Sequence, residues 1–422
     1  MRTPPPTKQI HTRLWASARG ISNLSPDLYI EIEPICCIRG MALSSLTDMN
    51  SATTSSGNLT LLSHLLLAVG ANDGAELATA PRVTQTLRAG IGQSLAAYGP
   101  QDLQELWNLA NSHHVILRAF PGLYRLMLAE GNDSVAWVEQ AMEKERQRID
   151  HALSFLAPIC EALGEAGDVL VIKSLDHWPD LGNDLDLYSN AAGSDIISIM
   201  GNRFGAKLDE RSWGDRLANK FNFVVPGLPE LVEVHVARLG QTGEQVALTD
   251  SLVQWSRTAQ FGTHSFRVPA PENRLLISTL QRMYRHFYLR LCDIVDTARL
   301  VESNAVDYSR LQSIARTAGL WDGCATYLTL VSGYVKSYRG EGLSLPPLVT
   351  DSARFGGHQM QFKKKFLRIP IFPQAAGLYA SEWKRLLLNG ELENTFRLSL
   401  LPGLAAAAAL EFKLTGSDKG IW

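Results

Sequence analysis

The chain has 422 residues, of which 45% are hydrophobic and 19% are charged, and its formal net charge is −2. This composition is typical of a globular protein with enough residues for two or three domains. A net charge this close to zero excludes an overall electrostatic field that would gather nucleic acid or an anionic membrane. We therefore expect no nucleic-acid partner unless a local basic patch recruits one.

Cysteine spacing and hydropathy bear on the compartment. The five cysteines show no CxxC spacing, and nothing that resembles a secretory signal precedes them. The longest uncharged apolar run, residues 398–410, is too short to cross a bilayer and contains a proline and a glycine. We expect a cytoplasmic protein without a transmembrane segment.

The first 150 residues fall into two predicted regions. Residues 1–58 lack periodicity and end in a stretch rich in Ser, Thr and Asn, so we expect disorder there, and the biological start could lie at Met41. Residues 59–150 place apolar side chains three and four positions apart, which predicts a helical region. Within it, Pro100 marks a helix start, residues 121–122 mark a break, and residues 132–134 cap a charged helix.

Residues 151–270 change to a period of two, which is typical of strands. The predicted strands are 168–173, 184–189, 220–225, 231–237 and 264–268, with a helix over 194–204. This segment is the predicted catalytic core. The predicted fold class is α+β, with a small mixed sheet flanked by N-terminal and C-terminal helical regions.

The C-terminal part is predicted to be helical. A long amphipathic helix opens at Pro271 and runs through Leu300, and further helices follow at 307–318 and 322–336. Residues 271–340 therefore form a predicted helical domain. Residues 341–422 form a tail that contains prolines, a run of three lysines and a final apolar helix, and no role is assigned to it.

Acidic side chains recur on two of the predicted strands. Because side chains alternate along a strand, Asp184 and Asp186 share one face of DLDLY, and Glu233 and His235 share one face of ELVEVHVA. If the two strands are neighbours, Glu233 can approach both aspartates. Carboxylates this close repel each other unless a cation lies between them, and oxygen ligands suit Mg²⁺ or Mn²⁺ bridged to phosphates. The sequence thus predicts metal ligands and catalytic groups at Asp184, Asp186 and Glu233, the alternative being two solvated acids on an edge strand.

The order of elements around these motifs resembles a known family. A helix leads into a strand that ends in VIKS, then a loop, DLDLY, a helix, a strand with VEVH and the helical stretch RMYRHFYLRLCDIVDTARL. Over about residues 150–335 this order is similar to the uncharacterised bacterial nucleotidyltransferase family related to the DNA polymerase beta superfamily. The resemblance implies that Asp184 and Asp186 bind metal and that Glu233 orients or deprotonates an acceptor hydroxyl. It also implies that Lys173 and Ser174 lie at the bound nucleotide.

The chain departs from the family pattern at two places. Ser174 stands where the family has glycine, and the arginine that commonly precedes the Asp-x-Asp strand is absent from PDLGN. A serine lets the backbone approach phosphate less closely than glycine does, although its hydroxyl can donate to phosphate instead. On the predicted long helix, His286, Arg290 and Asp293 would share one face. The resemblance implies nucleotide binding by His286 and Arg290, whereas Arg290 and Asp293 could instead form an ion pair within the helix.

These expectations give one leading function and two alternatives. We expect an enzyme that binds a nucleoside triphosphate with two magnesium ions and transfers a nucleotidyl group to a hydroxyl of a small molecule or a protein. A glycosyltransferase that holds manganese through Asp-x-Asp is the first alternative, and it predicts a nucleotide-binding βαβ region before the motif, where this sequence predicts helices. The second alternative is a scaffold that keeps the nucleotidyltransferase fold without turnover, as Ser174 and the missing arginine suggest.

Overall fold

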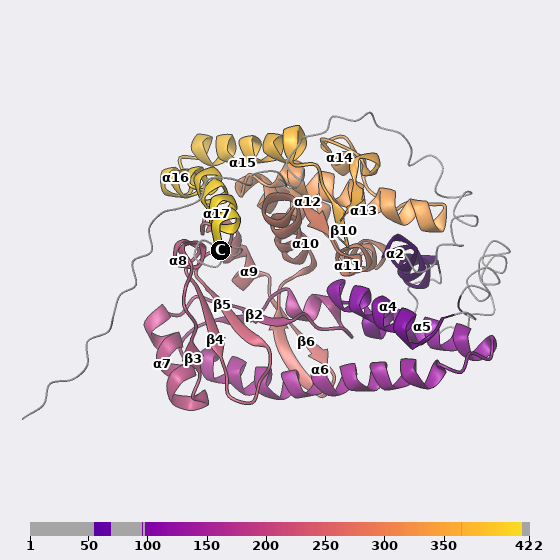
Figure 1. The fold of residues 1–422 in the computed structure, drawn as a ribbon. Coiled ribbons are helices and arrows are strands. Elements are labelled where there is room, and N and C mark those ends of the chain that lie inside the picture. The colour runs from indigo at the N-terminus through magenta and orange to yellow at the C-terminus, as the bar shows by residue number, and fades with distance from the viewer. Residues whose placement is uncertain (1–54, 69–94, 96–97, 364, 416–422) are drawn as a thin grey trace, which may run out of the picture. The chain divides into compact units, whose positions relative to one another are not determined.

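The structure is a computed structural model that describes residues 55–68, 95, 98–363 and 365–415 (Figure 1). The fold class is α+β, as predicted from the sequence, with many helices and three small sheets among the described residues. The segment predicted to be disordered, 1–58, lies outside the described residues except for its last four, which begin helix α2 (Ser55–Ser63). No helix in the described ranges is both long and apolar enough to cross a membrane.

The N-terminal half is helical. After α2 come the π-helical turn η2 (His64–Ala68) and helices α4 (Pro100–Ser112), α5 (Ile116–Ala129) and α6 (Val135–Gly164). The predicted helix starts at Pro100 and directly after residue 134 are confirmed. The predicted break at 121–122 is wrong, because α5 continues through Pro121. The buried apolar face of α5 holds the helix together across this proline, since packing contributes more to helix stability than local propensity does.

The central sheet is mixed. Its strands are β1 (Val169–Val171), β2 (Asp184–Ser189), β3 (Lys207–Leu208), β4 (Lys220–Val224) and β5 (Leu231–Val236), in the order β1-β2-β5-β4-β3. Strands β2 and β5 are parallel, and the other pairs are antiparallel. Helices α7 (Gly193–Phe204) and α8 (Trp213–Leu217) lie between β2 and β5 in the chain, and α6 packs against β1 and α7 (Figure 1). The apolar positions of the two parallel strands are fully buried, namely Leu185, Leu187, Val232 and Val234.

Two smaller sheets complete the described strands. Helix α9 (Ala247–Gln254) leads into the hairpin of β6 (Arg257–Phe261) and β7 (His264–Val268). Strand β7 is predicted from the sequence, whereas β6 is missed because it is mostly exposed and polar. The other small sheet has the order β8-β10-β9, with β8 (Tyr288–Leu289), β9 (Gln361–Lys363) and β10 (Phe366–Arg368).

The predicted long helix over 271–300 is wrong in one respect, because it is interrupted. The chain forms α10 (Pro271–Thr279), the π-helical segment η5 (Leu280–His286), strand β8 and then α11 (Leu291–Glu302). The interruption falls at Phe287, whose φ is +54°, and the next two residues pair with β10 instead of continuing the helix. Pairing with a distant segment thus overrides the local helical period. As a consequence, His286, Arg290 and Asp293 do not share one helical face.

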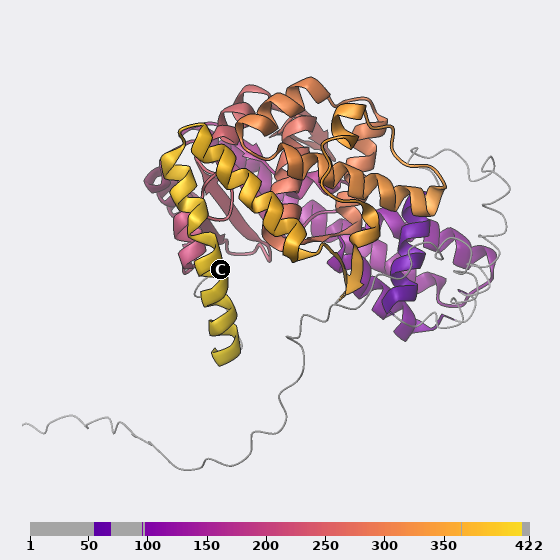
Figure 2. The same cartoon turned by 90° about the horizontal axis from the view of Figure 1, so that it is seen from above.

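The C-terminal region is packed onto the helical domain. Helices α12 (Tyr308–Thr317) and α13 (Trp321–Arg339) lie close to their predicted bounds. The predicted tail then holds α14 (Pro347–Thr350), the turns η6 (Gly357–Gln359) and η7 (Ile371–Ala375), α15 (Ala376–Leu388), α16 (Leu392–Ser399) and α17 (Leu401–Thr415). Helix α15 contacts η5 and α13, so this part of the tail belongs to the folded body, and Figure 2 shows α17 projecting from it.

Candidate active site

The two acidic strands are direct neighbours. Strands β2 and β5 run parallel, with Asp186 opposite Glu233 and Asp184 opposite Leu231. The assumption that brings Glu233 to the aspartates is therefore confirmed. Asp186 and Glu233 are half-buried, whereas Asp184, at the start of β2, is exposed.

Lys173 lies between these carboxylates. Its ammonium contacts a carboxylate oxygen of Asp186 and lies 3.3 Å from Glu233 Oε1 and 3.2 Å from His235 Nε2. The lysine side chain is only 12% exposed, so little water reaches its ammonium group, and the carboxylates of Asp186 and Glu233 balance its charge. In the conformation described here, the position between the acids holds an ammonium group.

The backbone at Lys173 adopts an uncommon conformation. Its φ is +59° and its ψ is −59°, and the Ser174 amide donates to the carbonyl of Ile172 at 2.5 Å, which makes a three-residue γ-turn. A side chain other than glycine in this region costs about 1–3 kcal/mol, and such residues gather at functional sites. The turn ends β1 and directs Lys173 toward Asp186.

Ser174 connects the loop to β2. Its hydroxyl donates to the Asp184 carbonyl at 2.9 Å and accepts from the Asp186 amide at 2.7 Å. Both bonds use the backbone of the acidic strand, and Ser174 is only 2% exposed. The predicted contact between this hydroxyl and phosphate would require both hydrogen bonds to β2 to break. In this structure Ser174 instead fixes the position of the acidic strand.

Two lysines and a histidine surround the carboxylate of Glu233. Its carboxylate lies 3.0 Å from Lys220 Nζ and 2.7 Å from His235 Nε2, in addition to Lys173. Burial alone would raise the pKa of Glu233, but Lys173, His235 and Lys220 outweigh burial and hold it well below the ordinary value. Burial and the neighbouring charges of Asp186 and Glu233 raise the pKa of Asp184 to about 6. The three acids therefore interact as one cluster.

The cluster also offers a set of metal ligands. Asp186, Glu233 and His235 each present one ligand atom, and these atoms all lie within 4.8 Å of one another. Ligand atoms that each sit about 2.0–2.6 Å from one ion can be this far apart, so the residues fit a divalent cation. Asp184 is outside this set. The ligand group thus differs from the predicted trio, because His235 takes the place given to Asp184, and an imidazole ligand favours a transition metal over magnesium.

A narrow cleft adjoins the cluster. Lys173 and His235 form part of its lining together with residues from η5, from the loop after β5 and from the C-terminal helices. Arg285 also lines it, and within the described part of the chain its guanidinium has no hydrogen-bond or ion-pair partner. Arg285 was not singled out from the sequence. An unpaired cation beside an acidic cluster is a suitable ligand for phosphate.

The two residues predicted on the long helix have other surroundings. Arg290 lies 2.6 Å from His114 Nε2, and its backbone amide donates to Asp293, which in turn pairs with Arg282 at 2.7 Å. Burial and the charges of Arg285, Arg282, Arg290 and Lys173 lower the pKa of His286 to about 2, so this imidazole is neutral. None of the described ion pairs joins either residue to the acidic cluster, although a basic environment does surround His286.

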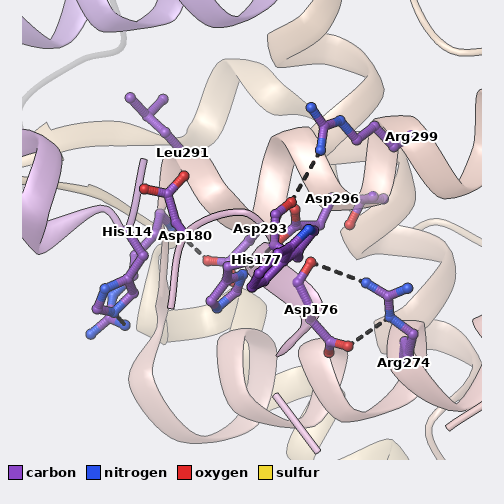
Figure 3. A network of polar contacts seen from close by, with 12 residues as sticks. His114, Asp176, His177, Asp180, Arg274, Leu291, Asp293, Asp296 and Arg299 are labelled. Atoms are coloured by element: carbon purple, nitrogen blue, oxygen red, sulfur yellow. Dashed lines mark hydrogen bonds and ion pairs between the residues drawn. The ribbon is translucent and has the colours of Figure 1, made fainter. Parts of the chain in front are cut away.

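A second group of charged residues anchors the loop between β1 and β2 (Figure 3). The 3-10 turn η4 (Ser174–His177) places His177 Nδ1 2.5 Å from Asp296, and Asp296 also lies 2.5 Å from Arg118. Arg118 pairs with Asp180 at 2.9 Å, and Asp176 pairs with Arg274 at 2.6 Å. We call these six residues the buried charge network. It ties the loop that carries Lys173 and Ser174 to α5, α10 and α11, and no local sequence pattern reveals it because its members come from distant segments.

Comparison with known proteins gives no match: no family model, no curated protein and no solved structure is similar to this chain. The resemblance of the motifs to the nucleotidyltransferase family therefore has no independent support from relatives.

Proposed function

We propose that this protein is a metal-dependent nucleotidyltransferase whose reaction centre is the cluster of Asp184, Asp186, Glu233 and His235. The observation that carries the proposal is the register of β2 and β5, which sets Asp186 beside Glu233, in contact with Lys173, which lines a cleft together with Arg285. Asp186, Glu233 and His235 would hold one divalent cation, and the exposed Asp184 would help to hold a second one on the triphosphate. When bound, these ions would neutralise phosphate charge and make an acceptor hydroxyl easier to deprotonate.

The cationic side chains of the cleft have a defined role in this proposal. A lysine is a flexible point charge, so Lys173 can leave Asp186 and Glu233 when a cation binds them and can contact a phosphate oxygen instead. Arg285 would bind the triphosphate in place of the arginine that is missing before the Asp-x-Asp strand. Glu233 would then orient the acceptor hydroxyl or accept its proton.

One observation favours the alternative of a scaffold without turnover. Lys173 contacts the carboxylates where a cation would bind, and a permanent ion pair there would exclude metal. The two proposals differ in whether a divalent cation displaces this ammonium. The glycosyltransferase alternative has less support, since the described residues before β1 form helices and not the βαβ unit that it predicts.

Calorimetric titration of ATP, GTP, CTP and UTP into the protein tests the proposal. We expect at least one triphosphate to bind in the presence of Mg²⁺ or Mn²⁺, and we expect the affinity to fall at least about tenfold in Asp186→Asn, which is about 1.4 kcal/mol. Asp195→Asn, an exposed aspartate on α7, serves as the matched control and should bind like the unmodified protein. Triphosphate binding that needs no metal and is unchanged in Asp186→Asn would contradict the enzyme proposal and favour the scaffold.

A further inference from the structure

The cleft beside the acidic cluster contains two buried acids that the proposed reaction does not use. Glu244, in the loop after β5, is 3% exposed, and Glu382, on α15, is 1% exposed, and both line the cleft. Buried carboxylates are rare without partners because removing a charge from water is unfavourable. Their environment therefore indicates what the cleft is built to hold.

The Glu244 carboxylate is fully supplied with donors from its own loop. It accepts hydrogen bonds from the Thr242 amide and hydroxyl, each at 2.9 Å, and from the Gln241 amide at 3.3 Å. Gly240 has a φ of +93°, and a side chain there would overlap the Glu244 carboxylate. The loop is thus shaped around the Glu244 carboxylate, which it holds in place.

Only one of the two carboxylate oxygens of Glu382 has a hydrogen-bond donor among the described residues. Its Oε1 atom accepts from Gln245 Nε2 at 2.5 Å, whereas Oε2 is buried and has no hydrogen-bond partner among the described residues. A buried acceptor without a donor is uncommon and calls for an explanation, such as a ligand or an ordered water. Because burial and the charge of Glu244 raise the pKa of Glu382 well above its ordinary value, a positive ligand would be needed to keep both acids ionised.

The rest of the lining limits the size and chemistry of the ligand. The walls are mainly aliphatic, from Leu239, Ile277, Leu280, Leu398 and Leu401. The cleft encloses about 520 Å³ of space between protein atoms, part of it open to solvent. Aliphatic walls suit an alkyl chain, and the two buried acids suit a positive group at the end of that chain. An ammonium group on an alkyl chain meets these conditions.

The two cations of the cleft are close enough for their charges to interact, and Lys173 contacts the acidic cluster. Lys173 and Arg285 are both more exposed than Glu244 and Glu382. The charge of Lys173 is offset by Asp186 and Glu233, and Arg285 is the proposed phosphate ligand. The cleft therefore combines a buried acidic part with a phosphate-binding part next to the proposed reaction centre.

We propose that Glu382, with Glu244 beside it, binds the primary ammonium group of the acceptor, so that the acceptor is a small amino alcohol. This inference rests on the proposed function. In the reaction, the acceptor hydroxyl oxygen forms a bond to the α-phosphorus, the bond between the α-phosphorus and the bridging oxygen breaks, and pyrophosphate leaves. The hydroxyl proton passes to Glu233, and the ammonium group remains unchanged.

The test uses the full chain and simple probes without nucleotide or metal. Aminopentanol is titrated calorimetrically against pentanediol, which has the same length but no ammonium group. We expect the amino alcohol to bind at least about tenfold more tightly than the diol, and we expect Glu382→Gln to abolish the preference. Glu105→Gln, an exposed glutamate on α4, is the matched control and should keep the preference.

A second variant covers the case in which Glu382→Gln does not fold. Leu401→Trp fills the cleft from a partly exposed position and should also abolish binding of the amino alcohol. Equal binding of the two probes, or an amine preference that survives in folded Glu382→Gln or in Leu401→Trp, overturns the inference, and the space then holds water alone. Mass spectrometry after addition of a triphosphate and Mg²⁺ separates the two proposals. Amine binding without a nucleotidyl product contradicts only the proposed function, whereas transfer to alcohols without an amine preference contradicts only this inference.

Discussion

The acidic cluster and the buried charge network are built from similar residues but have different properties. Each brings a histidine and acidic side chains together, and in each a trio of potential ligand atoms lies within 4.8 Å: Asp186, Glu233 and His235 in the cluster, and His177, Cys292 and Asp296 around the network. The partners of the acids differ. Lysines neutralise the cluster beside a cleft, whereas Arg118 and His177 neutralise Asp296 in the interior.

Proximity of ligand atoms is therefore not sufficient for a metal site. A guanidinium is rigid and held by several hydrogen bonds, and Arg118 also donates to the His114 carbonyl at 2.7 Å, so it cannot withdraw. Lys173 can move away from the carboxylates because its side chain is flexible and the neighbouring cleft offers space for its ammonium group. We therefore propose that the buried charge network stabilises the fold and that the acidic cluster binds metal.

The largest expected effect is a loss of stability from the network. Asp296→Ala leaves Arg118 and His177 buried without their common partner, which should cost about 3–5 kcal/mol of unfolding free energy. Urea denaturation at neutral pH measures it. The exposed Asp195→Ala is the control and should change stability by less than about 0.5 kcal/mol. A change as small as the control's would show that the network does not stabilise the fold.

The next effect distinguishes Arg285, which the structure places in the cleft, from Arg290, which the sequence predicts to bind the nucleotide. Arg285→Gln removes an unpaired cation from the cleft and should weaken triphosphate binding by about 1.5–3 kcal/mol, the range of a hydrogen bond to a charged group. Arg290→Gln should leave that binding almost unchanged, because Arg290 already contacts His114. Calorimetry on both variants gives the comparison, and the reverse order would restore the role expected from the sequence.

Lys173→Met tests whether the lysine competes with a cation. Loss of the ammonium should strengthen Mn²⁺ binding to the protein without nucleotide and weaken ATP binding in the presence of Mn²⁺, each by about tenfold. The opposite signs follow because the lysine blocks the metal position in one state and contacts phosphate in the other. If both affinities fell together, Lys173 would be a structural support of the site and not a competitor.

The last effect concerns pH. Burial alone would lower the pKa of His177, but Cys292 and Asp296 raise it well above the ordinary value, so the folded protein keeps a proton that the unfolded chain releases above about pH 6.5. Its contribution is complete below that pH and is lost as the pH rises toward the folded pKa, by up to about 1.4 kcal/mol per unit. Denaturation curves between about pH 6.5 and 8.5 should show this slope, and His177→Gln should flatten it. An unchanged slope in the variant would assign the pH dependence to other groups.

The sequence predicts the strands of the site better than its cations. Alternation in DLDLY places β2 correctly, and the shared acidic face of the two strands anticipates the meeting of Asp186 and Glu233. The interruption at Phe287 escapes the local pattern because it depends on pairing with β10, far along the chain. The same interruption removes Arg290 from its predicted face. Arg285 joins the site through tertiary packing, which helical and strand periods do not encode, whereas the alternation of β5 already places His235 on the same face as Glu233.

Binding of Mn²⁺ followed by electron paramagnetic resonance tests the central claim most directly, because the signal of the free ion is lost when the ion binds protein. We expect the protein with a non-hydrolysable triphosphate to bind Mn²⁺, and we expect Asp186→Asn and Glu233→Gln each to reduce the affinity at least about tenfold while Asp195→Asn does not. Binding that is equal in all three variants, or no binding beyond that of the triphosphate alone, would contradict a metal site between β2 and β5.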